Sequence, residues 1–474
     1  MTGWHDLPVE IRWMMFDYIK ELAQLWPSND PPYPQLPRVS REWNYHFAHT
    51  NFRVLVLDQD RLDDFKKIIS NNKSRRKHVE SIFLWVKLPE YDCDVCQTAE
   101  DYNTSLQNTE IFVQAVHKLF SIMSTWTRPQ LRLKKGIALE IGAYSPSDGQ
   151  HGFRDCRLFK QFPHLATPEM HNSSLLEGQA AASDDADSCP EWLRAQDGKE
   201  PLIGSKRRLL ATLGPPAVPL WSSRAATDFS ACPIFDSLSI QHHCYRHISP
   251  VLVQRILKAL PRVNFFRGDT WVHPDDSTRS AYHEDLAFIF NDMPKSLRHV
   301  ILSYETRAPF RPRKSWTSVL PMSQNTLARA IAKYATELKS LSVTYQIDAP
   351  GFIEHSLDLA RPFNRLEYLE LTLPYETSRW SIIILLEKVS RLVFWLMPKL
   401  KRLHIWSEFN TQSFHCYLSR TPKGNYRFEW RSTWVPWASI RTLKQDMRWN
   451  LLLHQPGKIL WVSSLRGHRE MKFC

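Results

Sequence analysis

Residues 366–371 read LEYLEL, and this short stretch sets a pattern that recurs along the second half of the chain. The form is a leucine, then a polar residue, then any residue, and then apolar residues at alternate positions. It returns at 297–302 (LRHVIL), 338–343 (LKSLSV) and 400–405 (LKRLHI). Such alternation is typical of a β-strand with one buried face. We therefore predict four short strands that share one phase.

Amphipathic segments that suit helices separate these strands, at 282–293, 324–335, 351–359 and 381–397. Earlier in the chain the same reading predicts a helix at 62–69 and strands at 52–57, 79–85, 137–141 and 235–240. Units of a strand and a helix that recur in this way predict a curved solenoid, because each unit buries its apolar face only against its neighbours.

The architecture resembles leucine-rich-repeat proteins, although the asparagine or cysteine that closes the usual motif is missing. An ordinary α/β domain with an open parallel sheet is the alternative.

Two regions interrupt the repeats. Residues 165–230 are rich in Ala, Ser, Asp, Gly and Pro, which predicts a flexible insertion. Residues 413–474 contain many tryptophans and are expected to cap the last repeat.

The N-terminus has a different period. In WHDLPVEIRWMMFDYI (residues 4–19) and just beyond it, apolar residues follow helical spacing and form one face, comprising Ile11, Met14, Met15, Tyr18, Ile19 and Leu22. Pro8 suits a first helical turn, where its missing N–H costs nothing. The sequence predicts an amphipathic helix that begins near Pro8.

Leu7-Pro8-x-Glu10-Ile11, this helix, and then VSREW at 39–43 together resemble an F-box, with fungal F-box-like proteins as the nearest type. A proline-rich insertion at 26–37 departs from the usual motif. The resemblance implies that the helices bind a Skp-type adaptor and its cullin complex through Leu7, Pro8, Ile11, Met15, Ile19, Val39 and Trp43. The alternative is an amphipathic helix that merely docks on the core of its own chain.

The composition limits which classes of partner and which cellular locations we expect. The 474 residues carry a formal charge of +12, but the basic clusters at 73–77, 206–208 and 311–314 are short and are expected to be solvated surface. Nucleic acid is therefore an unlikely partner. Eight scattered cysteines fit a reducing compartment. Without a long apolar run or a signal-peptide pattern, we expect no membrane contact and a cytoplasmic or nuclear location.

Three groups of residues contain side chains of the types that bind metals or take part in catalysis. Cys93-x-x-Cys96 has no second pair at zinc-finger spacing, so two structural cysteines are expected there rather than zinc or redox chemistry. His242-His243-Cys244 with His247 follows a strand, where alternate side chains diverge. His283-Glu284-Asp285 is expected to be an exposed helix start. We predict no catalytic residues, no metal site and no cofactor.

These observations predict an α/β chain with a helical F-box-like unit (1–50), first repeats (51–164), a flexible insertion (165–230), a leucine-rich-repeat-like domain (231–412) and a cap (413–474). The expected function is not enzymatic. It is substrate recognition in an SCF-type, cullin-RING ubiquitin ligase, with an unknown substrate protein on the repeats. A repeat scaffold for protein binding without a ubiquitin link is the alternative.

Overall fold

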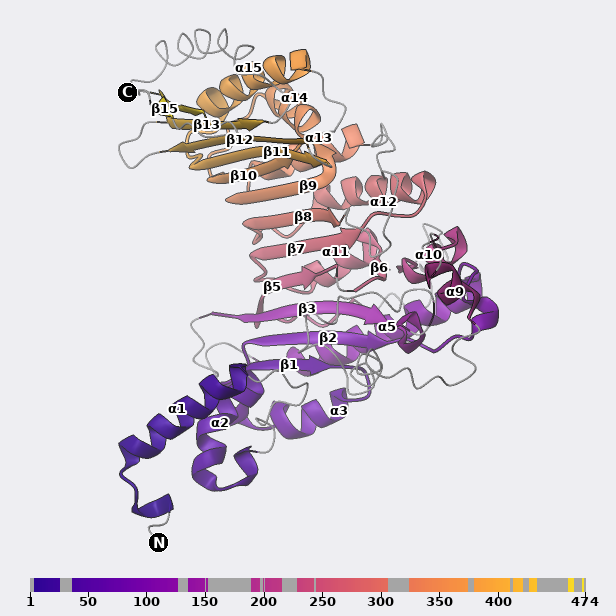
Figure 1. The fold of residues 1–474 in the computed structure, drawn as a ribbon, viewed down its shortest axis with the longest axis vertical. Helices are drawn as coiled ribbons and strands as arrows, with labels where there is room; N and C mark the ends of the chain where they lie inside the picture. The colour runs from indigo at the N-terminus through magenta and orange to yellow at the C-terminus, as the bar shows by residue number, and fades with distance from the viewer. Residues whose placement is uncertain are drawn as a thin grey trace.

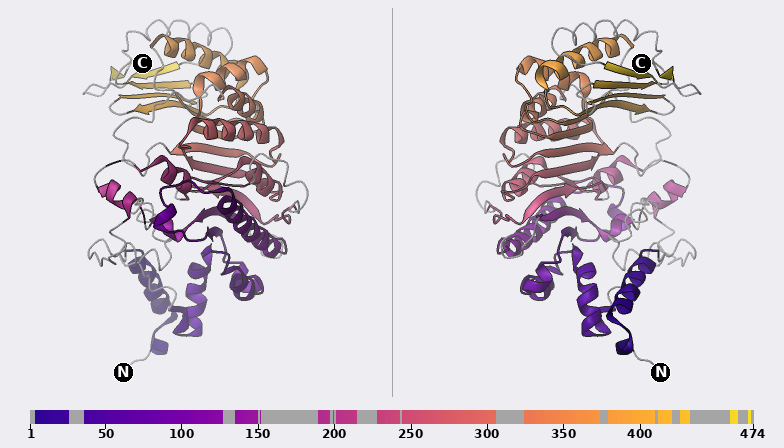
Figure 2. Two further views of the ribbon diagram at one scale, coloured as in Figure 1. Left: turned by 90° about the vertical axis from the view of Figure 1, so that its right-hand side faces the viewer. Right: turned by 90° about the vertical axis from the view of Figure 1, so that its left-hand side faces the viewer.

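The computed structural model has its two ends at opposite extremes of its long axis (Figures 1 and 2). Between them lies one large, mostly parallel sheet with helices packed on it. The structure describes residues 4–25, 36–126, 135–149, 151, 189–196, 199, 201–214, 228–242, 244–305, 324–373, 379–409, 412–420, 426–432, 459–463 and 471–472.

The strands of the large sheet lie side by side in the order in which they occur along the chain, like rungs of a ladder (Figure 1). They are β1 (Val54–Leu57), β2 (Ser81–Lys87), β3 (Ile137–Tyr144), β5 (Phe235–Ile240), β7 (Phe265–Trp271), β8 (His299–Glu305), β9 (Ser340–Asp348), β10 (Tyr368–Thr372), β11 (Arg402–Phe409), β12 (Gln412–Arg420), β13 (Tyr426–Ser432), β14 (Ile459–Ser463) and β15 (Met471–Lys472).

Neighbouring strands from β1 to β11 run parallel, and β12 then pairs antiparallel with both β11 and β13. A small second sheet pairs β4 (Thr212–Leu213) with β6 (His247–Ile248). Parallel neighbours need a crossover connection, and helices supply most of these crossovers here. The predicted α/β class is confirmed.

The α-helices are α1 (Val9–Leu25), α2 (Arg41–Arg53), α3 (Leu62–Phe65), α4 (Lys73–Arg76), α5 (Tyr102–Met123), α9 (Pro190–Gln196), α10 (Ile203–Leu209), α11 (Pro250–Lys258), α12 (Asp276–Ile289), α13 (Gln324–Ala335), α14 (Ala349–Leu359) and α15 (Arg379–Leu396). Short turns of other helix types are η1 (Trp4–Asp6), η2 (Leu36–Arg38), η3 (Lys66–Ser70), η4 (Cys93–Val95), η5 (Pro146–Gly149) and η9 (Phe290–Asp292). Among the described helices, none has the length and apolar character that crossing a bilayer requires.

Side-chain caps fix where several of these helices begin. Asp101 accepts a hydrogen bond from the backbone N–H of Thr104 at α5, and Asp348 accepts one from Gly351 at α14. Ser249 precedes Pro250 and caps α11 in the same way. Each cap satisfies a backbone donor that the first helical turn leaves unpaired, so a polar residue at this position sets the helix start.

The leucine that opens each repeat lies in a turn, not in the strand. The amide nitrogens of Leu297, Leu338, Leu366 and Leu400 each donate to the carbonyl three residues earlier, at 3.1 to 3.3 Å. All four leucines are at most 1% exposed. The predicted strands therefore began two residues too early, because the first apolar residue packs into the core from the turn.

These turns stack on one another from repeat to repeat. The residue that follows each leucine donates its N–H to the carbonyl of the equivalent residue in the preceding repeat, in the pairs Arg298 to Asn264, Lys339 to Arg298, Glu367 to Lys339 and Lys401 to Glu367. The four distances lie between 2.7 and 2.8 Å. Successive repeats thus share one backbone geometry although their sequences differ.

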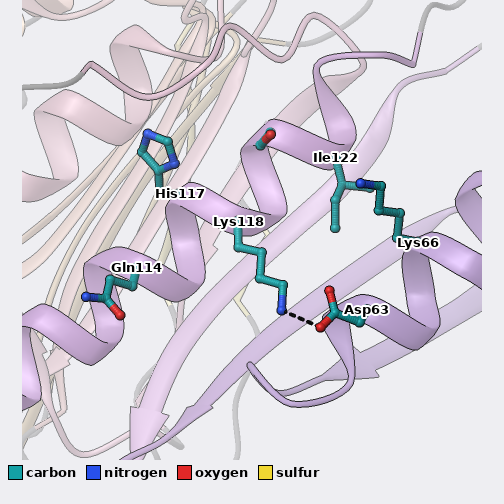
Figure 3. A pocket seen from close by; sticks show the side chains of 7 residues that line it. Asp63, Lys66, Gln114, His117, Lys118 and Ile122 are labelled. Atoms are coloured by element: carbon teal, nitrogen blue, oxygen red, sulfur yellow. Dashed lines mark ion pairs between the residues drawn. The ribbon is translucent and has the colours of Figure 1, made fainter.

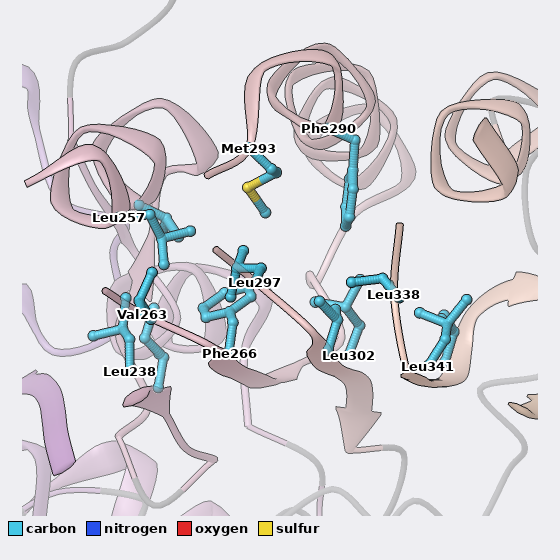
Figure 4. Close-up of a cluster of buried hydrophobic side chains, with 14 of the residues drawn as sticks. Leu238, Leu257, Val263, Phe266, Phe290, Met293, Leu297, Leu302, Leu338 and Leu341 are labelled. Carbon is cyan, nitrogen blue, oxygen red and sulfur yellow. The ribbon is translucent and has the colours of Figure 1, made fainter. Parts of the chain in front are cut away.

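The main core lies between the helices and one face of the sheet. Figure 4 shows Leu238, Phe266 and Leu302 from neighbouring strands below Leu257 of α11 and Phe290 of η9. All of these side chains are at most 3% exposed. Close packing of this kind contributes the largest favourable term to folding, so the alternate apolar positions of the strands decide which face carries helices.

Some elements were not predicted. The helices α5 and α11 and the strands β7 and β12 were missed, although Ser249-Pro250 is a recognisable helix start for α11. The helix predicted at 62–69 is α-helical only to Phe65 and continues as a π-helical turn. The helix α12 begins at Asp276 instead of 282.

The predicted insertion at 165–230 includes α9, α10 and β4 among its described residues, and the rest of that prediction lies outside them. The prediction of a mostly solvated basic cluster at 206–208 is wrong for Lys206 and Arg208, which are only 6% and 5% exposed, and holds for the exposed Arg207. Arg208 donates to the carbonyls of Thr98 and Ala99. The basic cluster at 311–314 and most of the segments at 26–37 and 433–474 lie outside the described residues.

Candidate functional site

The two halves of the N-terminal motif meet in a small helical unit formed by α1 and α2. Phe16 of α1 is fully buried, with its ring centroid 5.1 Å from Trp43 and 5.5 Å from Phe47, both on α2. Trp4 completes the aromatic cluster at 5.3 Å from Phe16. Aromatic groups of this size supply most of the buried area that so short a unit can gain.

Polar contacts fix the same interface. Arg12 Nη1 of α1 lies 2.7 Å from Glu42 Oε2 of α2, and Trp4 Nε1 donates to that oxygen at 3.0 Å. Ser40 caps α2 by accepting from the backbone N–H of Trp43 at 3.3 Å. The motif residues 39–43 therefore set both the start of α2 and its contact with α1.

Most of the predicted apolar face of α1 is on the opposite side and faces solvent, whereas Ile19 is half-buried and the side chain of Leu22 lies outside the described residues. Its residues Ile11, Met14, Met15 and Tyr18 are 41%, 67%, 42% and 60% exposed. Within the described part of the chain, α1 uses Phe16 and Arg12 for its own packing and leaves these four side chains exposed. Large apolar side chains gathered on one exposed helix face mark an interaction surface more often than scattered ones do.

The seven predicted adaptor-binding residues divide into two groups. Pro8, Ile11, Met15 and Val39 are exposed. The other three, Leu7, Ile19 and Trp43, are half-buried, and Trp43 belongs to the aromatic cluster inside the unit. Met14 and Tyr18 were not among the predicted contacts, although their spacing from Ile11 could have included them.

The second candidate surface is the face of the sheet opposite the helices. Pairing across β9 to β13 places Ser342, Glu370, His404, Tyr417 and Glu429 in one row. These residues contribute to the lining of a shallow pocket of about 420 Å³. The strands thus bury one side chain and present the next, as their alternation predicts.

Hydrogen bonds organise this row around Glu370. One of its oxygens lies 3.0 Å from His404 Nδ1 and accepts from Trp406 Nε1 at 3.0 Å, and the other accepts from Ser342 at 2.9 Å. The hydrogen bond with His404, aided by those from Ser342 and Trp406, lowers the pKa of Glu370 although burial raises it. The His404 ring also stacks on Tyr417 at 4.1 Å. The surface is polar, aromatic and held in one geometry.

A third hollow, of about 370 Å³, lies between α3 and α5 (Figure 3). Lys118 Nζ pairs with Asp63 Oδ2 at 2.9 Å across it. Both side chains are more than 40% exposed, and exposed pairs contribute little to binding or stability. We assign no role to this hollow.

The described residues of the histidine-rich group at 242–247 have different neighbours from one another. His247 stacks on His273 at 3.9 Å, and burial lowers the pKa of His247 to about 3. Cys244 instead packs with Phe83, Trp85 and Tyr144. His247 and Cys244 therefore lie in different surroundings.

His283 was predicted to be exposed, and this is wrong. It is fully buried in the middle of α12, with Nε2 2.8 Å from the Tyr304 hydroxyl. Burial, together with the charge of Arg279, lowers its pKa to about 4, so it is neutral in the folded chain. The helix begins earlier than predicted, which moves His283 from the first turn to the core-facing side.

Cys93 and Cys96 meet two further donors that spacing did not indicate, His151 and Cys189. The four residues are too far apart in the sequence to form a recognisable metal-binding motif. One signal existed: the Cys93 and His151 segments follow the carboxyl ends of strands predicted one after the other, and adjacent parallel strands end at the same edge.

Comparison with known families finds a match in the second half of the chain. Residues 289–462 match the model of DUF6546, a family of unknown function. A search of curated proteins finds no match for the chain. The matched region begins at the end of α12 and extends into β14, so it contains the row around Glu370 but neither the N-terminal helices nor the Cys93 cluster.

Proposed function

We propose that this chain is a substrate-recognition subunit of an SCF-type, cullin-RING ubiquitin ligase. Its N-terminal unit binds a Skp-type adaptor, and its sheet domain holds a substrate protein. The observation that carries the proposal is the group of exposed apolar side chains on one face of α1, with Ile11, Met14 and Met15 at 41%, 67% and 42% exposure. A helix that only capped its own domain would bury this face.

Within the N-terminal unit, some motif residues hold the two helices together and others stay available for a partner. Phe16, Trp43 and the Arg12–Glu42 pair hold α1 against α2, so the helix keeps its shape without using its apolar face. Burial of exposed Met and aromatic side chains by a partner is a common source of binding energy at protein interfaces. This arrangement fits the F-box resemblance of residues 7–11 and 39–43.

We further propose that the sheet and its helices form an irregular leucine-rich-repeat-like solenoid. The repeated turns at Leu297, Leu338, Leu366 and Leu400 and the backbone ladder between them support this. A solenoid offers a continuous open face, and the row around Glu370 and His404 provides rigid polar and aromatic groups for a substrate protein.

The mechanism is proximity, not chemistry by this chain. A substrate held on the sheet stays near a ubiquitin-charged enzyme bound to the same complex, which raises its effective concentration. The Glu370–His404 pair serves as a contact surface in this proposal. The localisation that follows is cytoplasmic or nuclear.

The test is co-purification of the full chain with a Skp-type adaptor. The double variant Ile11→Asp, Met15→Asp should abolish the complex, because two charges would be buried at its centre. Phe288→Asp is the matched control, since Phe288 is 70% exposed on α12, far along the chain from α1. It should bind as the wild type does.

If neither the wild type nor the control retains the adaptor, the ligase proposal fails and a protein-binding scaffold without a ubiquitin link takes its place. Equal binding by all three proteins would also contradict it. Equal binding would mean that the adaptor contacts residues outside α1.

A further inference from the structure

Four metal-ligating side chains converge beside the first strands of the sheet. The ligand atoms of Cys93, Cys96, His151 and Cys189 all lie within 4.8 Å of one another. Cys93 and Cys96 come from the turn after β2, His151 follows η5 beyond β3, and Cys189 directly precedes α9. Residues up to 96 positions apart in sequence thus meet at one point.

The distances fit a tetrahedral ion. Zinc bonds of roughly 2.3 Å to sulfur and 2.0 Å to nitrogen, at tetrahedral angles, place nitrogen and sulfur about 3.5 Å apart. His151 Nδ1 lies 3.3 Å from Cys93 Sγ and 3.5 Å from Cys189 Sγ. These two distances are close to the spacing that such an ion requires, and all four ligand atoms lie within 4.8 Å of one another.

The imidazole is held in the orientation of a ligand. His151 Nε2 lies 3.3 Å from the Tyr91 carbonyl oxygen, and the Tyr91 ring stacks on the imidazole at 5.2 Å. A proton on Nε2, donated to that carbonyl, leaves the lone pair of Nδ1 directed at the sulfurs. Metal-binding histidines are commonly positioned by a backbone carbonyl in this way.

A buried network fixes Tyr91 in turn. Its hydroxyl donates to Asp148 at 3.1 Å, and the Arg208 guanidinium lies 5.0 Å from its ring centre. Asp148 also pairs with Arg246, whose side chain is 1% exposed, and Arg246 pairs with Glu100. Behind the half-buried Tyr91, the support is therefore built from nearly buried polar groups, which is the setting of a preformed site.

We propose that Cys93, Cys96, His151 and Cys189 form a structural zinc site. Three thiolates and one imidazole complete a tetrahedral shell, which leaves no position for water and so no catalytic role. Binding releases the thiol protons to solvent and involves no oxidation. The ion joins the loop after β2, the turn after β3 and the start of α9.

The experiment uses the full chain, purified without chelator from zinc-containing medium. Elemental analysis should find about one zinc ion per chain. Replacement by Co²⁺ should give the thiolate charge-transfer absorption and the intense d–d bands of a tetrahedral cobalt site. Wild-type protein that contains no zinc and takes up no Co²⁺ would overturn the proposal.

Variants separate ligand loss from general damage. Cys96→Ser and Cys189→Ser should lose most of the zinc, whereas Cys416→Ser, at a buried cysteine of β12, should retain it. His151→Cys should retain zinc with an all-sulfur cobalt spectrum, and His151→Ala should not. Retention of zinc by both cysteine variants would contradict the assignment. So would a Cys96–Cys189 disulfide in the intact wild type, detected by mass spectrometry.

Discussion

The helices α1 and α13 have the same kind of sequence and opposite surroundings. Both place apolar residues at helical spacing, but Leu327 and Ile331 of α13 are fully buried whereas Ile11 and Met14 of α1 are 41% and 67% exposed. The helix α13 has α12, α14 and β9 around it, while α1 packs through Phe16 on its other side. Periodicity therefore identifies an apolar face, but the neighbouring elements decide whether it becomes core or contact surface.

The largest effect in this comparison should come from truncating α13. Ile331→Ala should lower the free energy of unfolding by about 2–5 kcal/mol, because it leaves a cavity in the core. Ile11→Ala should change it by less than about 0.5 kcal/mol. Urea unfolding followed by circular dichroism measures both. Similar losses for the two variants would mean that α1 is also covered.

The second effect in order of size should come from acid, which should destabilise the sheet domain. Burial keeps His283 and His247 neutral, with pKa values of about 4 and about 3, whereas in the unfolded chain they protonate near 6.5. The unfolded state then binds more protons, so stability falls as the pH drops below 6.5, by about 1.4 kcal/mol per pH unit for each such histidine.

Urea midpoints at several values between pH 7 and pH 4.5 measure this slope. His283→Gln should reduce it by the share of one histidine, since glutamine does not titrate. An unchanged slope in this variant would show that His283 is not the group that couples folding to protons.

A smaller effect is expected from the pair that joins α1 to α2. Glu42→Ala removes the acceptor of both Arg12 and Trp4 and should destabilise the N-terminal unit by about 1–2 kcal/mol. Hydrogen exchange should quicken for the amides of α1 and α2 and stay unchanged in α13. Faster exchange along the whole sheet would instead indicate that the unit and the repeats unfold together.

The smallest effect should come from the exposed face itself. Met14→Gln and Tyr18→Ser should leave the urea midpoint unchanged within error, because neither side chain is buried by the chain. Binding of a hydrophobic dye, or self-association on gel filtration, should decrease instead. A clear loss of stability would show that these residues have intramolecular contacts.

The sequence predicted the repeating strands well because their alternation is local. The strand at 235–240 and the helix at 324–335 were predicted with the bounds that the structure has. Strand starts at Leu338 and Leu366 were wrong by two residues, since a turn leucine and a strand leucine have the same apolar character. The strand β7, FFRGDTW, escaped because Arg267, Gly268 and Asp269 interrupt its apolar pattern.

Sequence by itself determined the local elements: the amphipathic helix at the N-terminus, the alternating strands and the order in which they follow one another. These depend on spacing within a few residues, which the chain carries directly. Only the tertiary structure decided that Ile11, Met14, Met15 and Tyr18 of α1 are exposed, that His283 is buried, and that Cys93 and Cys96 meet His151 and Cys189. Each of these depends on contacts between segments far apart in sequence, and no local spacing encodes which segments will become neighbours.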